Sequence, residues 1–134
     1  KTYLALVHGV PAHDRGTIDA PLRQFGSGRV AVDVRRGKPS RTELAVVERF
    51  RDFALVEAYP HTGRRHQIRV HLYSVGHPIV GDPLYGEKAI QGRYARLMLH
   101  ARRLTVRLPS GEDLTVEAPV PDSFRSILET VDDV

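Results

Sequence analysis

The stretch HTGRRHQIRVHLYSVGHPIVGDPLYG, residues 61–86, decides the fold of this chain because it places a helical segment between two strand-rich regions. Apolar residues recur on one side of this segment at helical spacing, namely Ile68, Leu72 and Val75. Thr62 is a suitable N-cap, and Gly76 stands where a residue in the left-handed conformation would end a helix. The spacing therefore predicts a helix of about three turns over residues 63–75.

Strand-forming sequence flanks this helix on both sides. The expected strands cover residues 2–8, 29–34, 42–50, 52–60, 104–108 and 114–119, and the last four form two antiparallel hairpins. Residues 10–24 are rich in Pro, Gly and Asp and predict an irregular connection, whereas residues 121–131 predict a terminal helix. This order indicates an α+β fold, a single domain over residues 1–134 with a mixed, mostly antiparallel sheet and packed helices.

The composition is that of a folded domain whose charge permits a nucleic-acid partner. Hydrophobic residues make up 41% and charged residues 27%, no apolar run is long enough to span a membrane, and cysteine is absent. We therefore expect a cytoplasmic setting and no membrane partner. The net charge is +4, and only three of the twenty cations are lysines. Arginine binds phosphate through paired hydrogen bonds and stacks on bases, although a genome that favours arginine codons explains the same composition.

Residue spacing argues against a metal site and against the common nucleophile motifs. His66 and His71 are five residues apart, about 140° around a helix, whereas a zinc-binding helix brings histidines together at i,i+4. None of the serines lies in a G-x-S-x-G elbow. The glycines of residues 76–86 form neither a dinucleotide fingerprint nor a Walker loop. We expect no metal ion.

The arginines of the helical segment are the better candidates for chemistry. Arg69 lies at the boundary between the apolar and polar sides of the predicted helix, and a partly buried guanidinium requires a carboxylate, a phosphate or carbonyl partners. One interpretation is a structural ion pair with a local acid such as Glu57 or Asp82. Arg64 and Arg65 favour a ligand instead, because cations in a first helical turn oppose the helix dipole unless phosphates approach.

Several motifs together resemble a known family. They are KTYLALVHG at residues 1–9, GTIDAPL at 16–22, GKPSRTELAVVERF at 37–50, HTGRRHQIRVHL with GHPIVGDPLYG in the opening stretch, and LMLHARRLTVRLPSGEDLTVEAPVPDSF at 97–124. In this order they resemble the RluA-type pseudouridine synthases, which isomerise uridine to pseudouridine in ribosomal or transfer RNA. The departures are Arg65, where Thr or Ser is common, and Leu44, where Tyr is common.

The resemblance implies a role for particular side chains. Arg69 would pair with the catalytic aspartate and keep it ionised, because an opposite charge lowers the pKa of an acid. Tyr3 would stack on the flipped uracil and assist proton transfer from its C5, and Leu99 would form an apolar floor beneath the base. The implied substrate-binding residues are Tyr3, Leu99, Arg64, Arg65, His66 and Gln67. The aspartate would act as the nucleophile, and no metal or organic cofactor is expected.

The nucleophile itself is missing from this sequence. The family carries it in an H-R-L-D-x-x-T-S-G motif upstream of K-x-Y, and no such stretch occurs here. We therefore expect the C-terminal part of a catalytic domain that is inactive alone, exposes apolar edge or face surface, and associates with the missing N-terminal part or a second copy. The expected substrate is large-subunit ribosomal RNA, with transfer RNA second, because GDPLYG favours the ribosomal group. The alternatives are a non-catalytic RNA-binding module of the same fold and a basic structural domain with an internal ion pair at Arg69.

Overall fold

The computed structural model describes residues 1–132, so Asp133 and Val134, the end of the predicted domain, lie outside the described residues. The elements are β1 (Thr2–His8), β2 (Arg15–Asp19), β3 (Leu22–Gln24), β4 (Val30–Val32), β5 (Arg41–Arg49), β6 (Phe53–Pro60), α1 (Gln67–Ser74), α2 (Lys88–Gln91), β7 (Leu99–Arg107), β8 (Asp113–Glu117) and α3 (Asp122–Asp132). Six strands form one sheet in the order β2-β5-β6-β1-β7-β8, and β3 and β4 form a separate hairpin. The predicted α+β fold is confirmed, and every pairing between named strands is antiparallel.

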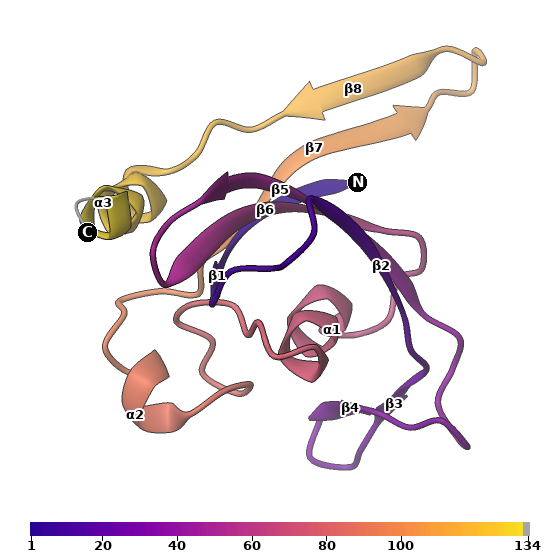
Figure 1. Ribbon diagram of the computed structural model, residues 1–134. Helices are drawn as coiled ribbons and strands as arrows, with labels where there is room; N and C mark the ends of the chain where they lie inside the picture. The colour runs from indigo at the N-terminus through magenta and orange to yellow at the C-terminus, as the bar shows by residue number, and fades with distance from the viewer. Residues whose placement is uncertain (133–134) are drawn as a thin grey trace.

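β1 lies inside the sheet and sets its register. It pairs with β6 on one side and with β7 on the other. Because side chains alternate between the faces of a strand, Tyr3, Ala5 and Val7 point to one face, and this face meets α1 around the cavity that Tyr3 lines. Figure 1 shows the sheet curving around α1, with α3 at the left end of the sheet and away from α1. The main buried cluster joins β1, β6, α1 and α3, as Leu6, Val56, Leu72 and Phe124 illustrate.

The predicted hairpins are confirmed, whereas the prediction of an irregular connection over residues 10–24 is wrong. β5 and β6 are joined through Phe50, Arg51 and Asp52, and the amide of Phe50 donates to the carbonyl of Phe53 at 2.9 Å. Residues 10–24, expected to be irregular, instead contain β2 and β3. β2 is an edge strand in which only Ile18 is buried, so it lacks the alternation of apolar residues that identifies a half-buried strand. The four-residue helix α2 was not predicted.

The central helix starts four residues later than predicted. His66 occupies the N-cap position with φ 54°, a left-handed conformation, and α1 begins at Gln67. Thr62 therefore does not cap the helix. Arg64 and Arg65 precede the first turn, so the argument that they oppose the helix dipole does not apply. Gly76 has φ +85° just beyond the helix, and its amide donates to the carbonyl of Tyr73 at 3.1 Å, as the sequence predicted for the C-terminal end.

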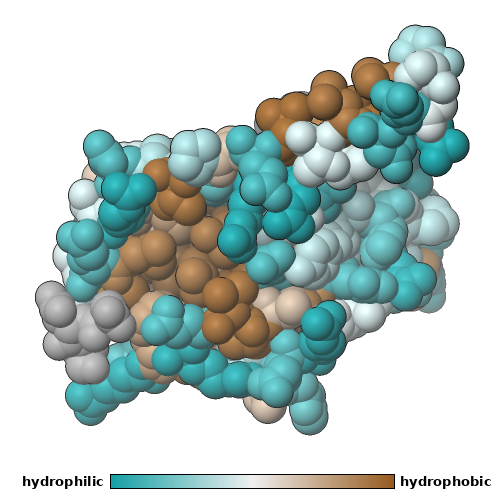
Figure 2. Space-filling model, turned by 90° about the horizontal axis from the view of Figure 1, so that it is seen from above, coloured by the Kyte–Doolittle hydropathy of each residue, from teal (hydrophilic) through white to brown (hydrophobic). Residues whose placement is uncertain are grey.

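β7 and β8 form a two-stranded ribbon with one apolar and one polar face. Cross-strand partners Leu104 with Val116 and Val106 with Leu114 share one face, and all four side chains are exposed. On the other face, Arg103 pairs with Glu117 at 2.9 Å, Thr105 with Thr115 at 2.9 Å, and Arg107 with Asp113 at 3.5 Å. Figure 2 shows apolar side chains along the projecting ribbon and a second apolar area over the sheet beside α3. The exposed apolar surface expected from the sequence is present.

No helix within residues 1–132 combines the length and the apolar character that crossing a bilayer requires.

Two left-handed glycines have very different surroundings. Gly76 and Gly81 have φ of +85° and +79°, so an L side chain would strain the backbone at either position. A Cβ at Gly76 would meet nothing within 4 Å, whereas a Cβ at Gly81 would collide with the carbonyl oxygen of Arg96. Gly81 therefore carries a packing constraint in addition to its backbone conformation.

Gly81→Ala should destabilise the protein more than Gly76→Ala. Both variants carry a backbone cost of about 1–2 kcal/mol, and Gly81→Ala adds about 1–3 kcal/mol of overpacking. Urea denaturation of the two variants and the wild type measures the difference in the free energy of unfolding. Equal losses would show that the contact with Arg96 relaxes without cost.

Candidate active site

A cavity of about 670 Å³ opens where β1, the segment before α1, α1 itself and the start of β7 meet. It is lined by Lys1, Tyr3, Pro60, His61, Thr62, Gly63, Arg64, His66, Gln67, Ile68, Arg69, Leu97 and Leu99. An aromatic ring, an apolar wall and several cations therefore face one space, and none of the aspartates and glutamates that the structure describes lines it. Of the seven side chains singled out from the sequence, six line this cavity, and Arg65 does not.

Arg69 forms a two-pronged ion pair with Asp82. Its Nε donates to Asp82 Oδ2 at 2.9 Å and its Nη2 donates to Oδ1 at 2.7 Å. The Asp82 side chain is fully buried, and Oδ1 also accepts the amides of Leu84 and Tyr85 at 2.9 and 3.2 Å. The bond to Asp82 raises the pKa of Arg69 above its usual value, against the opposing effect of burial.

This ion pair corrects the expectation that Arg69 waits for an acid supplied by other polypeptide. The local acid is Asp82 and not Glu57, which bonds to Arg102 at 3.2 Å and to the hydroxyl of Tyr59 at 2.7 Å. The pairing nevertheless leaves the Arg69 side chain 14% exposed and at the wall of the cavity that holds Tyr3 and Leu99. Arg69 Nη1 has no partner among the described residues, so one edge of the guanidinium can still meet a ligand.

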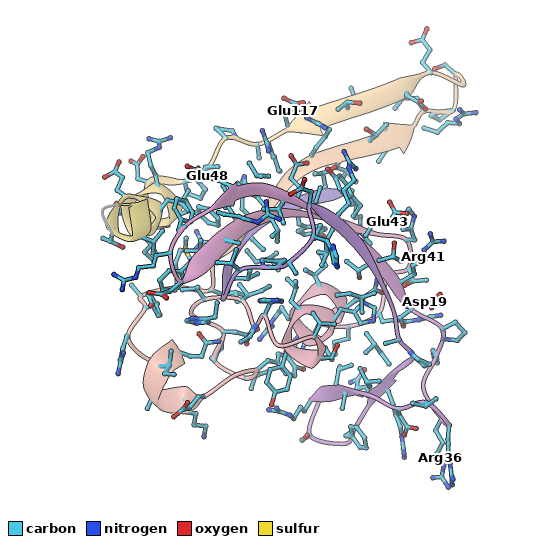
Figure 3. The ribbon with its side chains drawn as sticks, viewed as in Figure 1. Asp19, Arg36, Arg41, Glu43, Glu48 and Glu117 are labelled. Carbon is cyan, nitrogen blue, oxygen red and sulfur yellow. The ribbon has the colours of Figure 1, made fainter. Side chains whose placement is uncertain are left out.

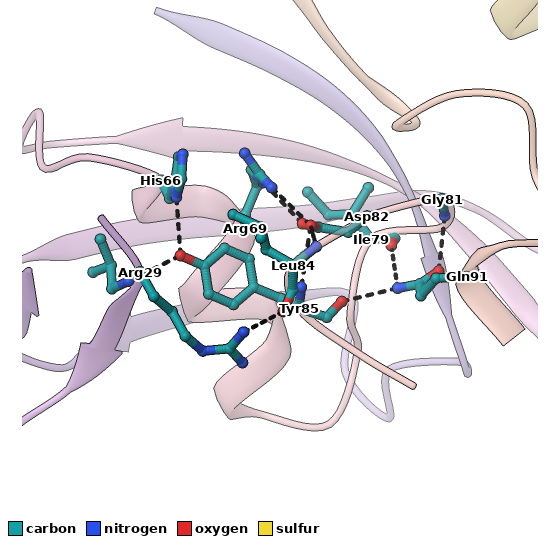
Figure 4. A network of polar contacts seen from close by, with 10 residues as sticks. Arg29, His66, Arg69, Ile79, Gly81, Asp82, Leu84, Tyr85 and Gln91 are labelled. Atoms are coloured by element: carbon teal, nitrogen blue, oxygen red, sulfur yellow. Dashed lines mark hydrogen bonds and ion pairs between the residues drawn. The ribbon is translucent and has the colours of Figure 1, made fainter. Parts of the chain in front are cut away.

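The loop that presents Asp82 is fixed by Gln91 from α2 (Figure 4). Gln91 Nε2 donates to the carbonyls of Ile79 and Tyr85 at 2.8 and 3.0 Å, and Oε1 accepts the amide of Gly81 at 2.8 Å. Gln91 Oε1 also forms a hydrogen bond with Nε2 of His8 in β1, at 2.9 Å. One buried amide thus connects the loop to the sheet, and nothing in the local sequence pattern distinguished it.

His66 is held in its left-handed conformation beside the cavity by Tyr85. The Tyr85 hydroxyl accepts the amide of Val30 at 3.0 Å and forms a second hydrogen bond with His66 Nδ1 at 2.9 Å. Burial lowers the pKa of His66, and the nearby charges of Arg69 and Arg65 lower it further. The ring that faces the cavity is therefore neutral at pH 7.

Gln67 orders the segment that forms the cavity rim. Its Oε1 accepts from the Thr62 hydroxyl at 2.6 Å and from the Arg64 amide at 3.1 Å, and its Nε2 donates to the Arg41 carbonyl and the Thr42 hydroxyl. The amide is thereby saturated within the chain. Gln67 is better described as a positioning residue than as the substrate-binding residue that the sequence predicted.

The side chains of Arg64 and Arg65 have different hydrogen-bond partners. Arg64 lines the cavity and donates to the Pro39 carbonyl from Nε and Nη2, whereas Arg65 donates to the Gly28 carbonyl and faces a second pocket. The sequence argument missed Lys1, His61 and Leu97 as lining residues, because only tertiary contacts bring these residues to the cavity. No group of histidines and carboxylates within residues 1–132 is arranged to hold a metal ion.

A sequence model described as RNA pseudouridylate synthase matches residues 1–74. The chain belongs to the RNA pseudouridylate synthase family. This result confirms the family expected from the sequence motifs, and it assigns the chain that forms this cavity to a defined class of proteins.

Relatives in this family extend the match over nearly the whole chain. The uncharacterized RNA pseudouridine synthase YlyB of Bacillus subtilis is 43% identical over 98% of this chain and 44% of its own length. Ribosomal large subunit pseudouridine synthase D of Nitrosomonas europaea is 41% identical over 96% of this chain and 40% of its own length. The structure of human RNA pseudouridylate synthase domain containing 1 superposes with a TM-score of 0.80 at 37% identity, covering 90% of this chain and 54% of that one. The chain spans less than half the length of the two curated relatives.

A second histidine, His71, is buried behind the cavity. Its Nδ1 accepts from the Thr42 hydroxyl at 2.8 Å, and its Nε2 donates to the Ala20 carbonyl at 2.9 Å. Burial lowers the pKa of His71, with partial opposition from the Ala20 carbonyl and from Asp19. The neutral ring connects α1 to β5 and to the segment that follows β2.

The free energy of unfolding should fall as the pH decreases below about 6.5, where histidine in the unfolded chain begins to bind protons. Because His71 has a depressed pKa in the folded protein, its contribution is complete above the unfolded pKa and is lost as the pH falls through the folded pKa. His66 acts in the same direction. His71→Gln should reduce the slope between pH 7 and 5, by at most about 1.4 kcal/mol per pH unit, in urea titrations.

The exposed His13 provides the matched control, since His13→Gln removes an imidazole without touching the buried contacts. If His71→Gln leaves the slope at the wild-type value, protonation of His71 is not linked to unfolding.

Proposed function

We propose that this chain forms the base-binding part of an RNA pseudouridine synthase active site, an isomerase that converts uridine to pseudouridine in large-subunit ribosomal RNA. The observation that carries the proposal is that Tyr3, Leu99 and Arg69 line one cavity, although they lie far apart in the sequence. Relatives described as ribosomal large subunit pseudouridine synthases support ribosomal RNA as the substrate, with transfer RNA second. A cytoplasmic location remains a prediction.

The cavity offers separate groups to separate parts of the substrate. The ring of Tyr3 supplies a flat surface for a uracil that has left its stack, and Leu99 supplies an apolar floor. The reaction breaks the bond between C1′ and N1, turns the base and forms the bond between C1′ and C5. C5 then loses a proton, which the Tyr3 phenol helps to transfer, and N1 gains one. No electrons are gained or lost, so the reaction requires no redox cofactor.

We infer that the nucleophilic aspartate comes from polypeptide outside residues 1–134, either another part of the same protein or a second copy. Among the residues that the structure describes, no carboxylate lines the cavity, and Asp82 is buried and already accepts bonds from Arg69 and two backbone amides. The greater length of the relatives and the exposed apolar face of the β7–β8 ribbon support this inference. Arg69 Nη1 would bond the incoming carboxylate and keep it ionised.

The second candidate is a non-catalytic RNA-binding module of the same fold. The specific observation in its favour is the cavity itself, which collects Lys1, Arg64 and Arg69 without an acid. Residues 1–134 alone should therefore bind RNA and release no tritium from RNA that contains uridine labelled at C5. Release of tritium by residues 1–134 would show that the chain contains its own nucleophile.

In the natural gene product that contains residues 1–134, loss of Arg69 should abolish turnover without loss of the fold. Arg69→Ala alone leaves Asp82 charged and buried, which costs about 3–5 kcal/mol. The double variant Arg69→Met/Asp82→Asn removes both charges and keeps an oxygen that can accept the amides of Leu84 and Tyr85, so it separates stability from activity. We expect at least about a 10²-fold slower release of tritium from uridine-labelled ribosomal RNA, with a cooperative melting transition that shows the fold is retained.

Arg51→Ala is the control, because Arg51 is exposed at the distant turn between β5 and β6. Turnover by the folded double variant at the wild-type rate would refute the role of Arg69. The absence of tritium release by the wild-type gene product from any RNA would refute the enzymatic function.

A further inference from the structure

A second pocket lies beside the cavity, between the β3–β4 hairpin and the segment that precedes α1. Its volume is about 410 Å³, and nine residues line it, among them Arg23, Arg36, Lys38, Arg64 and Arg65. Five of these nine residues are cationic, and none is acidic. Figure 3 shows Arg36 extending from the loop that follows β4, below the sheet.

The charge of this pocket is poorly compensated within residues 1–132. Arg23 pairs with Asp33 at 3.3 Å, and the same carboxylate also accepts the backbone amides of Arg35 and Arg36. Arg64 and Arg65 donate only to backbone carbonyls, as described above, and a carbonyl orients a guanidinium without neutralising it. The Arg36 and Lys38 side chains form no ion pair or hydrogen bond with the described residues. Such a concentration of charge stabilises an anion and is unfavourable without one.

The frame around these cations is held in place by tertiary contacts. Leu22 and Lys38 exchange two backbone hydrogen bonds, at 3.0 and 2.8 Å, which fixes the loop that carries Arg36 and Lys38 against β3. The amide of Val30 in β4 donates to Tyr85, which connects the hairpin to the loop of Asp82. The pocket is therefore ordered before a ligand arrives, which reduces the entropy lost on binding.

The two pockets share part of their walls. Gly63 and Arg64 line both, so a ligand in one lies next to a ligand in the other. The first pocket presents an aromatic ring and apolar side chains, whereas the second presents mainly guanidinium and ammonium groups. This division matches the two halves of a nucleotide, a flat base and a charged phosphodiester.

We propose that the second pocket binds a backbone phosphate of the RNA, next to the nucleotide whose base enters the first cavity. The inference rests on the proposed function, and it adds Arg23, Arg36 and Lys38 to the residues that hold the substrate. Arginine presents paired N–H donors that match the oxygens of a phosphodiester, and Lys38 adds a compact charge. The pocket thus positions the strand and carries no base specificity.

The test compares two double variants that remove the same charge. Arg36→Ala/Lys38→Ala removes the two cations of the pocket whose side chains form no hydrogen bond or ion pair with the described residues. Both residues are exposed, so the fold should persist. Arg51→Ala/Arg93→Ala is the matched control, because both arginines are exposed and line neither pocket. Binding of a fluorescein-labelled stem–loop RNA with a uridine-rich loop is measured over a range of potassium chloride concentrations.

For the pocket variant, the slope of log Kd against log salt should decrease by about 0.7 for each phosphate that the protein no longer neutralises, whereas the control should keep the wild-type slope. A methylphosphonate placed beside the loop uridine should weaken binding to the wild type and to the control more than binding to the pocket variant, which keeps only Arg23, Arg64 and Arg65 in the pocket. Equal slopes for the two double variants, or an equal effect of the methylphosphonate on both, would overturn the proposal. Turnover by the wild type would then still support the enzymatic function. Failure of the wild type to bind RNA would refute both.

Discussion

The buried carboxylate of Asp82 imposes the constraint on which the rest of the site depends. A charge removed from water must be neutralised by a close partner, and Arg69 does this with two parallel hydrogen bonds. The ion pair fixes the loop after α1 against α1 itself, and Gln91 fixes the same loop to β1 through His8. The orientation of the Arg69 guanidinium in the cavity is therefore determined by buried contacts and not by the cavity.

Buried polar side chains on the other side of α1 are likewise bonded to close partners. Gln67 and His71 are buried polar side chains, and each is bonded to partners from the β5 region, including Thr42. No buried side-chain nitrogen or oxygen within residues 1–132 lacks a hydrogen-bond partner. Because an unsatisfied buried polar group costs about 1–3 kcal/mol, these contacts disfavour any other arrangement of the helix under the sheet. The helix in turn aligns the first cavity with the basic pocket beside it.

Sequence periodicity predicted the hairpins and the terminal helix well, since their side chains alternate or repeat as local geometry demands. The edge strand β2 was not predicted because only Ile18 is buried. The start of α1 was misplaced because the Thr62 hydroxyl bonds the Gln67 side chain in place of a helix amide, and His66 takes the N-cap position. Motif resemblance brought Tyr3, Leu99 and Arg69 together correctly. It could not reveal which acid Arg69 bonds, or that Arg65 faces a different pocket, because both depend on contacts between distant segments.

The amphipathic ribbon of β7 and β8 also affects how this chain behaves in solution. β8 is the last strand of the sheet, so its outer backbone groups are unpaired while Leu114 and Val116 expose an apolar face beside them. Unpaired strand edges with adjacent apolar side chains are templates for pairing between molecules. Concentrated samples of residues 1–134 would thus tend to self-associate through this ribbon. Val116→Lys would place a charge on this apolar face and oppose such pairing.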